Sequence, residues 1–335
     1  MKTKIAINGF GRIGRNAFKV AYDREDVEVV ALNDLTDNAT LAHLLGHDSN
    51  YGIYPRRVES DENHVIVDEN PIQTYAEKDP SALPWSDLDI DVVIESTGRF
   101  TNPEDAQMHI TAGAKQVVIS APAKGDGADT IVLGVNDEDI RSSGEIVSNA
   151  SCTTNSITPV AGLMVQHFGV EKAMMTTIHS YTADQSLQDG PHRDLRRARS
   201  AAENIVPTTT GATIAAQQAL PQLEGVFDGL SIRVPTPVGS LSDFTFVLQQ
   251  DTTVEEVNQV MRQAAQSEAF KNILAVTDEP LVSRDMIGNS HSAIVDLGLT
   301  QVCGGNLAKI VAWYDNEWGY SNRLIELASQ LGARR

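Results

Sequence analysis

Short hydrophobic runs alternate with amphipathic stretches along the first third of the chain. KIAINGF, RIGRNAFKVAYD and VEVVALND predict a strand, a helix and a second strand in succession. The runs HVIVD, DVVIEST, QVVIS and TIVLGV follow, with the helical stretch PEDAQMHITAGA among them. Strands that alternate with helices pair in parallel through right-handed crossovers, and their buried positions are rich in Val and Ile. The pattern therefore predicts an α/β unit with a doubly wound parallel sheet.

The pattern changes after about residue 150. The apolar segments become longer, and several alternate with a period of two: AMMTTIHSYT, GLSIRVPTP, DFTFVLQQ, SAIVDLGLTQV and LAKIVAWYD. Helical stretches lie between them: SITPVAGLMVQHF, TGATIAAQQALPQL and TVEEVNQVMRQAAQSEAF. Strands with one covered face and segregated helices predict an α+β domain with a large mixed or antiparallel sheet. The polar stretch DQSLQDGPHRDLRRARS predicts a long surface loop, and loops of that length are commonly functional.

Composition and charge narrow the classes of function. The 335 residues, 41% hydrophobic and 21% charged, suit two globular domains that need no disulfide framework. No apolar run is long enough to span a membrane, and the N-terminus reaches a glycine-rich stretch before any apolar core, so we expect a soluble cytoplasmic protein. A net charge of −19 disfavours nucleic acid and anionic lipid as partners. The acidic surface suits a salt-adapted protein and an ordinary acidic one equally.

Three glycines at the start of the first helical stretch carry the first chemical signal. Gly9, Gly11 and Gly14 form GFGRIG between a strand and a helix, and Asp34 ends the next strand. In a Rossmann-type dinucleotide site such glycines allow the tight turn, the close approach of a pyrophosphate and the packing of helix on strand. The free N–H groups at the helix start hold the phosphates. Asp34 would accept bonds from the ribose hydroxyls and repel a 2′-phosphate, which favours NAD.

A cysteine and a histidine in the second half carry the other signal. Cys152 lies in SNASCTTNSITPVAGLM, where a loop runs into a helical stretch, and a helix N-terminus lowers the pKa of a thiol. A thiolate adds readily to an aldehyde, and His179 in TTIHSYT offers a base. Either residue alone is commonly a structural core residue. Together, with a dinucleotide motif upstream, they predict covalent aldehyde chemistry.

The chain closely resembles phosphorylating glyceraldehyde-3-phosphate dehydrogenases of the bacterial and eukaryotic type. The resemblance covers nearly the whole chain and rests on motifs in order: INGFGRIGR, ESTGRF, ISAPAK, SNASCTTN, MMTTIHSYT, PHRDLRRAR, IVPTTTGA, RVPTP and WYDNEWGYS. It implies that Cys152 attacks the aldehyde of glyceraldehyde 3-phosphate and forms a thiohemiacetal. His179 takes the hydroxyl proton as hydride leaves for NAD. Inorganic phosphate then cleaves the thioester to release 1,3-bisphosphoglycerate, in glycolysis or in reverse in gluconeogenesis.

The same resemblance assigns the binding residues. The Cys152 backbone N–H and His179 are implied to stabilise the oxyanion. The implied site for the substrate phosphate contains Arg233 and Thr182. The implied site for the attacking phosphate contains Ser151, Thr153, Arg197, Thr210 and Gly211. The implied cofactor residues are Asn8, Gly9, Gly11, Arg12, Ile13, Gly14, Asp34, Lys78, Ser96, Thr97, Ser120, Asn316, which holds the nicotinamide carboxamide, and Tyr320 beside that ring.

Two departures from the family pattern bear on the site. The common PTPNVS is PTPVGS here, with Val238 and Gly239, so the resemblance does not predict the hydrogen bonds of that loop. Gly190-Pro191 replaces the Leu-Pro of NAD-specific relatives, whereas Leu35 resembles the NAD-specific form. We therefore expect NAD, with NADP as a weaker second cofactor.

Two other functions fit the same architecture: an erythrose-4-phosphate dehydrogenase, and a catalytically silent binding protein. HSYTADQ and PTTTGA favour the glyceraldehyde phosphate enzyme over the first, and the presence of Cys152 and His179 argues against the second. We expect a dinucleotide-binding domain over 1–151 and 317–335 and a catalytic domain over 152–316. The resemblance also implies a homotetramer in which the Arg-rich loop reaches a neighbouring subunit's cofactor pocket.

Overall fold

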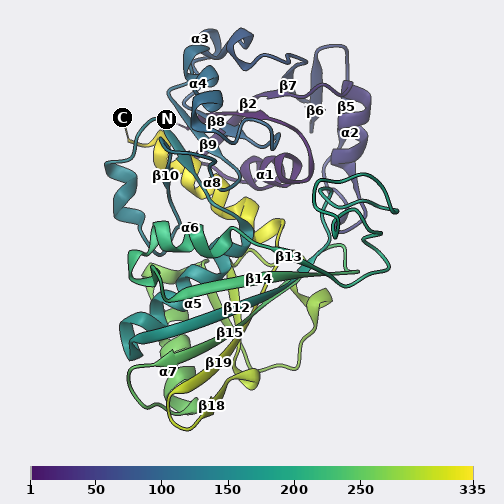
Figure 1. Ribbon diagram of the computed structural model, residues 1–335. Helices are drawn as coiled ribbons and strands as arrows, with labels where there is room; N and C mark the ends of the chain where they lie inside the picture. The colour runs from purple at the N-terminus through teal and green to yellow at the C-terminus, as the bar shows by residue number, and fades with distance from the viewer. Residues whose placement is uncertain (1, 335) are drawn as a thin grey trace. The chain divides into compact units, whose positions relative to one another are not determined.

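The fold is taken from a computed structural model that describes residues 2–334, and it contains two compact units (Figure 1). The first unit comprises the chain up to Ile131, the segment Asp137–Ala150 and the chain from Ser321 onward. The second unit comprises Val132–Asn136 and Ser151–Tyr320. Each unit is built around its own sheet and hydrophobic core.

The first unit contains a nine-stranded sheet within the described residues, in the order β10-β11-β9-β8-β1-β2-β7-β6-β5. The strands from β10 to β7 in that order pair in parallel, which confirms the predicted parallel sheet. A small hairpin of β3 (His47–Asp48) and β4 (Gly52–Ile53) lies outside the sheet. The sheet strands are β1 (Thr3–Asn8), β2 (Val27–Asn33), β5 (Val58–Ser60), β6 (His64–Val67), β7 (Asn70–Tyr75), β8 (Val92–Glu95), β9 (Gln116–Ile119), β10 (Asp129–Thr130) and β11 (Ile146–Ser148).

The helices of this unit follow the predicted alternation. The helix predicted after the glycines spans Arg12–Tyr22, and its apolar face packs on β1 and β2. The last helix of the chain contributes its residues from Ser321 onward to this unit. The helices are α1 (Arg12–Tyr22), α2 (Asn38–Gly46), α3 (Trp85–Leu88), α4 (Pro103–Thr111) and α8 (Trp318–Gly332).

Two predicted strands of this unit differ in the structure. HVIVD forms β6, but β6 pairs antiparallel with both β5 and β7. Asp68 and Glu69, with φ of 46° and 71°, make the tight turn from β6 to β7, and so short a connection leaves no room for a crossover helix. In TIVLGV only Thr130 belongs to a strand, β10, whereas Ile131–Leu133 are buried in irregular backbone.

The second unit contains a mixed eight-stranded sheet within the described residues, as predicted. Its order is β13-β14-β12-β15-β19-β17-β16, and β18 also pairs with β19. The β12–β14 and β16–β17 pairs are parallel, and the other pairs are antiparallel. The strands are β12 (Val170–Ser180), β13 (Val206–Thr209), β14 (Phe227–Val234), β15 (Ser240–Leu248), β16 (Leu274–Thr277), β17 (Ala293–Asp296), β18 (Gln301–Cys303) and β19 (Leu307–Tyr314).

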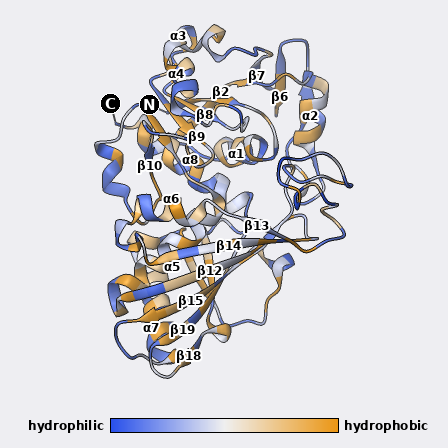
Figure 2. Ribbon diagram, in the orientation of Figure 1, coloured by the Kyte–Doolittle hydropathy of each residue, from blue (hydrophilic) through white to orange (hydrophobic). Residues whose placement is uncertain are grey.

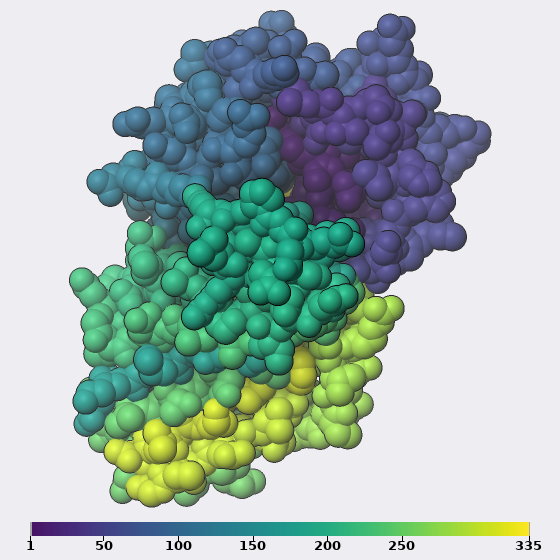
Figure 3. All heavy atoms as spheres, turned by 45° about the vertical axis from the view of Figure 1, so that its right-hand side comes forward, coloured from purple at the N-terminus to yellow at the C-terminus, as the bar shows by residue number. Residues whose placement is uncertain are grey.

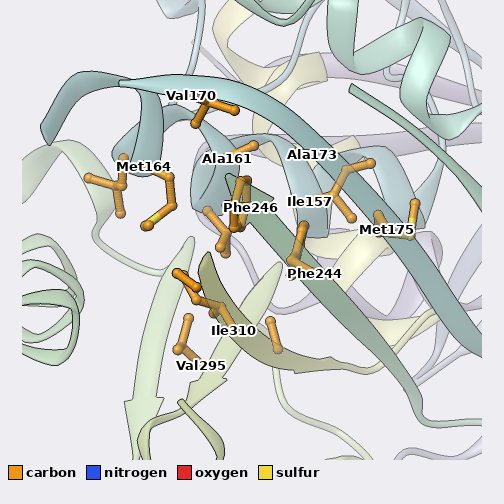
Figure 4. Close-up of a cluster of buried hydrophobic side chains, with 14 of the residues drawn as sticks. Ile157, Ala161, Met164, Val170, Ala173, Met175, Phe244, Phe246, Val295 and Ile310 are labelled. Atoms are coloured by element: carbon orange, nitrogen blue, oxygen red, sulfur yellow. The ribbon is translucent and has the colours of Figure 1, made fainter. Parts of the chain in front are cut away.

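Three helices cover one face of this sheet: α5 (Cys152–Phe168), α6 (Ala212–Ala219) and α7 (Val254–Ala265). Figure 4 shows α5 side chains meeting those of the strands, among them the stacked rings of Phe244 and Phe246, 5.6 Å apart. A buried aliphatic or aromatic side chain stabilises the fold by roughly 1.5–3 kcal/mol. This packing fixes the N-terminus of α5 relative to β12. The candidate catalytic residues lie on these two elements, Cys152 on α5 and His179 on β12.

The predicted surface loop between β12 and β13 is confirmed. Its backbone forms turns without a helix or strand (Figure 1), and most of it is hydrophilic (Figure 2). Its atoms lie on the face of the molecule that Figure 3 shows, in teal green. Leu187 and Leu195 are exceptions to its polar character, since they expose 78% and 80% of their surface.

Candidate active site

Cys152 is the first residue of α5. The preceding Ser151 is the N-cap, and its hydroxyl oxygen accepts a hydrogen bond from the Thr154 backbone N–H at 3.0 Å. Ala150, with φ of 52°, turns the chain just before it. Cys152 thus lies at the positive end of a long, largely buried helix, the position that the sequence predicted, and it keeps part of its surface open to solvent.

His179 lies near the end of β12 and faces the cysteine. Its Nε2 is 3.5 Å from the Cys152 Sγ, and its Nδ1 is 2.7 Å from the Ser180 carbonyl oxygen. A carbonyl oxygen only accepts, so the proton of the neutral ring is on Nδ1. The lone pair of Nε2 is therefore directed at the thiol, in the position of a base.

The protonation states differ from the prediction of a thiolate. Burial raises the pKa of the Cys152 thiol, and this effect outweighs the lowering by Arg233 and by the helix terminus. Burial, with repulsion from Arg233, lowers the pKa of His179 to about 3. The resting pair at neutral pH is therefore a neutral thiol beside a neutral imidazole.

Arg233 supplies a positive charge next to this pair. It lies on β14 in register with His179 on β12. Its Nη1 donates to the Thr182 hydroxyl at 3.2 Å and to the Ser180 carbonyl at 3.4 Å. Within residues 2–334 it forms no ion pair with a carboxylate, and its buried Nε has no hydrogen-bond partner. A largely buried guanidinium with only neutral partners favours the binding of an anion.

A second group of predicted residues gathers where α5 and α6 begin. The Thr154 hydroxyl donates to the Ala212 carbonyl at 3.3 Å and so ties the two helix starts together. The Thr210 hydroxyl oxygen accepts from the Ala212 N–H at 3.2 Å, and Gly211 is the N-cap of α6. Backbone N–H groups at helix starts and hydroxyls are suitable ligands for a phosphate.

The other two predicted members of this group already have protein partners. Arg197 pairs with Asp184, lies 3.4 Å from Asp194 and donates to the Thr209 carbonyl at 3.4 Å. The Thr153 hydroxyl is buried 3.0 Å from the Tyr314 hydroxyl. An anion at this point would have to compete with Asp184 for Arg197 and would meet the backbone N–H of Thr153, not its side chain.

Sequence reasoning did not single out Tyr314, although it lies in the quoted motif WYDNEWGYS. Its hydroxyl bonds to Thr153 at 3.0 Å and Thr177 at 2.8 Å, and its ring is 6.0 Å from that of His179. Burial raises the pKa of Tyr314, so the phenol is neutral. It joins the start of α5 to β12 and thereby supports the Cys152–His179 geometry.

The predicted glycines behave as a dinucleotide-binding turn requires. Gly9 has φ of 93°, and a Cβ there would lie 2.6 Å from the Thr97 backbone nitrogen. A Cβ on Gly14 would lie 2.1 Å from the Gly9 carbonyl oxygen. A Cβ on Gly11 would meet no atom within 4 Å, and no side chain caps the start of α1, so there is open space beside Gly11 at the helix start. The turn is shaped for an anionic ligand.

A cavity of about 270 Å³ adjoins this turn in the first unit. At its wall, the Asp34 carboxylate accepts from the Phe10 N–H at 2.7 Å and from the Thr36 N–H at 3.0 Å. Two fixed carboxylate oxygens remain able to accept further hydrogen bonds, as a ribose diol requires. The predicted residues that line the cavity are Asn8, Gly9, Gly11, Asp34, Lys78, Ser96 and Thr97.

Four predicted cofactor residues of the first unit are not among those lining this cavity: Arg12, Ile13, Gly14 and Ser120. Arg12 and Ile13 begin α1, and the Arg12 guanidinium pairs with the buried Asp48 at 2.7 Å. Ser120 follows β9. Asp48 was missed because its pairing with Arg12, 36 residues away, depends on the tertiary fold.

Asn316 and Tyr320 belong to the second unit, and both are buried. The Asn316 side-chain oxygen accepts from the Gly239 N–H and the Ser240 hydroxyl, each at 3.0 Å. Neither of these partners was predicted.

Comparison with known proteins gives matches over most of the chain. Residues 151–316 match the family described as the glyceraldehyde 3-phosphate dehydrogenase C-terminal domain, and residues 3–103 match its NAD binding domain. The chain is 52% identical to a glyceraldehyde-3-phosphate dehydrogenase of Borreliella burgdorferi, over 98% of this chain and 99% of that protein. It is 50% identical to a glyceraldehyde-3-phosphate dehydrogenase of Geobacillus stearothermophilus, over 100% of this chain and 99% of that protein. In the described part of the chain, no helix combines the length and apolar character that a membrane span needs.

Proposed function

The chain belongs to the glyceraldehyde-3-phosphate dehydrogenase family, and we propose that Cys152 and His179 carry out its oxidation of glyceraldehyde 3-phosphate. It is an NAD-dependent oxidoreductase of glycolysis. The observation that carries the residue assignment is the 3.5 Å approach of His179 Nε2 to Cys152 Sγ at the start of α5. NAD, when bound, supplies the acceptor for the hydride that leaves the substrate carbon.

The protein's own groups handle the acyl and proton steps. Nε2 of His179 accepts the thiol proton as Sγ forms a bond to the aldehyde carbon, and it passes that proton to the aldehyde oxygen, which becomes the hemiacetal hydroxyl. The free Nε2 then takes the hydroxyl proton as the hydride leaves the substrate carbon. The backbone N–H of Cys152 and the ring of His179 stabilise the oxygen on which charge develops. The thioester retains the free energy of the oxidation until phosphate replaces the sulfur.

Two anion sites complete the proposal. Arg233, with Thr182, binds the phosphate of the substrate, because its guanidinium is largely buried without a carboxylate partner. The starts of α5 and α6 bind the attacking phosphate through Ser151, Thr153, Thr210 and Gly211, with Arg197 released from Asp184. Asp34 selects NAD over NADP by charge repulsion, and NADP serves as a weaker second cofactor.

The phosphate requirement tests this function. We expect sustained NADH formation from glyceraldehyde 3-phosphate, NAD and inorganic phosphate. Without phosphate we expect one burst, of at most one NADH per active site, because the thioester then has no acceptor. Absorbance at the NADH band in a stopped-flow instrument measures both. Undiminished multiple turnover without phosphate would show a hydrolytic enzyme and overturn the proposal.

We further propose a homotetramer in a reducing cytoplasm, which keeps the Cys152 thiol reduced. Its support is the loop between β12 and β13, where Leu187 and Leu195 are about four-fifths exposed on the single chain. Light scattering should give four times the 36.2 kDa chain mass. Paired Leu187→Ser and Leu195→Ser substitutions should lower that mass, while Val282→Ser, an exposed apolar residue elsewhere, should not. A monomeric wild type would refute the assembly.

A further inference from the structure

The side-chain amide of Asn316 is held in one orientation. Its Oδ1 accepts from the Gly239 backbone N–H and from the Ser240 hydroxyl, both at 3.0 Å. Since a backbone N–H can only donate, Oδ1 and not Nδ2 must face Gly239. Within residues 2–334, Nδ2 has no protein hydrogen-bond partner, and it is not sealed from solvent. The amide therefore presents a donor outward.

Ser240 connects this amide to the catalytic strand. The hydroxyl oxygen that donates its hydrogen to Asn316 accepts from the Ser180 backbone N–H at 3.2 Å. The Ser180 hydroxyl in turn donates to the Gly239 carbonyl at 2.9 Å. Ser180 is the neighbour of His179, and its carbonyl oxygen is the acceptor for the imidazole Nδ1. One buried set of hydrogen bonds thus joins the catalytic ring to the Asn316 amide.

The local backbone at Gly239 depends on the absence of a side chain. Gly239 has φ of 90°, a region that a β-branched residue rarely adopts. A Cβ at this position would lie 2.5 Å from the Ser283 carbonyl oxygen. A glycine at this position therefore permits the turn that directs the Gly239 N–H to Asn316.

We propose that Ser240 is a positioning residue for the cofactor, which fixes the Asn316 amide with Nδ2 outward and ties its position to the Ser180–His179 segment. The inference rests on the proposed role of Asn316 toward the nicotinamide carboxamide. A carboxamide has an acceptor oxygen that an outward N–H₂ can bind. Without the Ser240 hydroxyl, Asn316 retains one donor, the amide is freer to rotate, and the buried Ser180 N–H loses its acceptor.

Ser240→Ala is the direct test. We expect the Kd for NAD alone, measured by isothermal titration calorimetry, to rise roughly tenfold, as the loss of a buried hydrogen bond predicts. KM for NAD should rise with it. The alkylation rate of Cys152 by iodoacetamide should change little, because Cys152 and His179 keep their contacts.

Ser242→Ala is the matched control. Ser242 lies two residues along the same strand, is equally buried, and has a hydroxyl with no hydrogen-bond partner in the described part of the chain. Its replacement should leave the Kd for NAD unchanged. A control that weakens binding as much as Ser240→Ala would attribute the effect to general packing and overturn the inference.

A double-mutant cycle with Asn316→Ala separates this inference from the proposed function. If Ser240 acts through Asn316, Ser240→Ala should have no further effect on the Kd in the Asn316→Ala background. If Asn316→Ala weakens NAD binding but the two effects simply multiply, Ser240 acts elsewhere and the inference is wrong. If Asn316→Ala leaves NAD binding intact, the proposed role of Asn316 is wrong, and the inference about Ser240 that rests on it is wrong as well.

Folding of the variants is checked by their thermal midpoints. Should Ser240→Ala fail to fold, Ser240→Cys fills the same space with a much weaker donor. It should raise the Kd for NAD in the same direction. A folded Ser240→Cys variant that binds NAD as well as the wild type would overturn the inference.

Discussion

Replacement of Cys152 by Ser is expected to reduce the rate of NADH formation by about 10⁴-fold, a loss typical of removing a catalytic nucleophile. The serine hydroxyl is far less acidic than a thiol, and the neighbouring base, His179, is weak because burial and Arg233 lower its pKa to about 3. Ser also cannot form a thioester, so phosphate would have no activated acyl group to attack. Initial rates at saturating aldehyde, NAD and phosphate measure the loss.

Cys303→Ser is the control for this experiment. Cys303 is exposed on β18, and it is the only other cysteine of the chain. Its replacement should leave the rate unchanged. Both variants should keep the wild-type Kd for NAD and thermal midpoint, because neither side chain belongs to the dinucleotide turn. A Cys152→Ser enzyme that turns over within tenfold of the wild type would remove Cys152 from the mechanism.

Local sequence rules predicted the dinucleotide turn because each of its requirements is local. Gly9 needs a left-handed φ, and Gly14 needs contact with the Gly9 carbonyl five residues away. The alternation of apolar runs likewise predicted parallel pairing, which β1 shows with both β2 and β8. It did not predict the antiparallel placement of β6, because a buried strand has the same composition in either direction and the deciding feature was a two-residue turn.

The remaining features depend on neighbours that are distant in sequence. Ser240 and Asn316 are 76 positions apart, and Thr153 and Tyr314 are 161 apart, so no local pattern links them. The protonation state of Cys152 was mispredicted for the same reason. A helix start can be recognised from SNASCTTN, but the burial that raises the thiol pKa depends on the tertiary fold, which also brings His179 from β12 to within 3.5 Å of Sγ.

His179→Gln is expected to lower kcat/KM by roughly 10²–10⁴-fold at pH 7, the usual contribution of a general base. Gln cannot take the thiol proton, although it can occupy the space of the ring. His167→Gln is the control, since His167 is exposed near the end of α5 and should be replaceable without loss. Unchanged kcat/KM in His179→Gln would show that the thiol loses its proton elsewhere.

The pH profile gives this prediction a second readout. In the wild type the pKa of His179 lies far below that of ordinary histidine, so the base stays available down to acidic pH. A phosphate bound to Arg233 would offset the positive charge that lowers this pKa and would strengthen the base in the substrate complex. In His179→Gln no imidazole takes the thiol proton, so the reaction depends on the small fraction of Cys152 that ionises in water. That fraction is small at neutral pH because burial raises the pKa of the thiol. The residual kcat/KM of the variant should therefore rise with pH and approach the wild type in alkaline solution.

Folding stability should respond to pH through the same residue. Because the folded pKa of His179, about 3, is below the ordinary value of 6.5, the unfolded chain binds the proton first as pH falls. The stabilising contribution is complete above 6.5 and is lost between 6.5 and about 3. His179→Gln removes this linkage, so its denaturant midpoint should fall less than that of the wild type between pH 7 and pH 4.5. Equal losses in the two proteins would mean that His179 has the same pKa in the folded and unfolded chains, which would contradict the lowering of its pKa by burial.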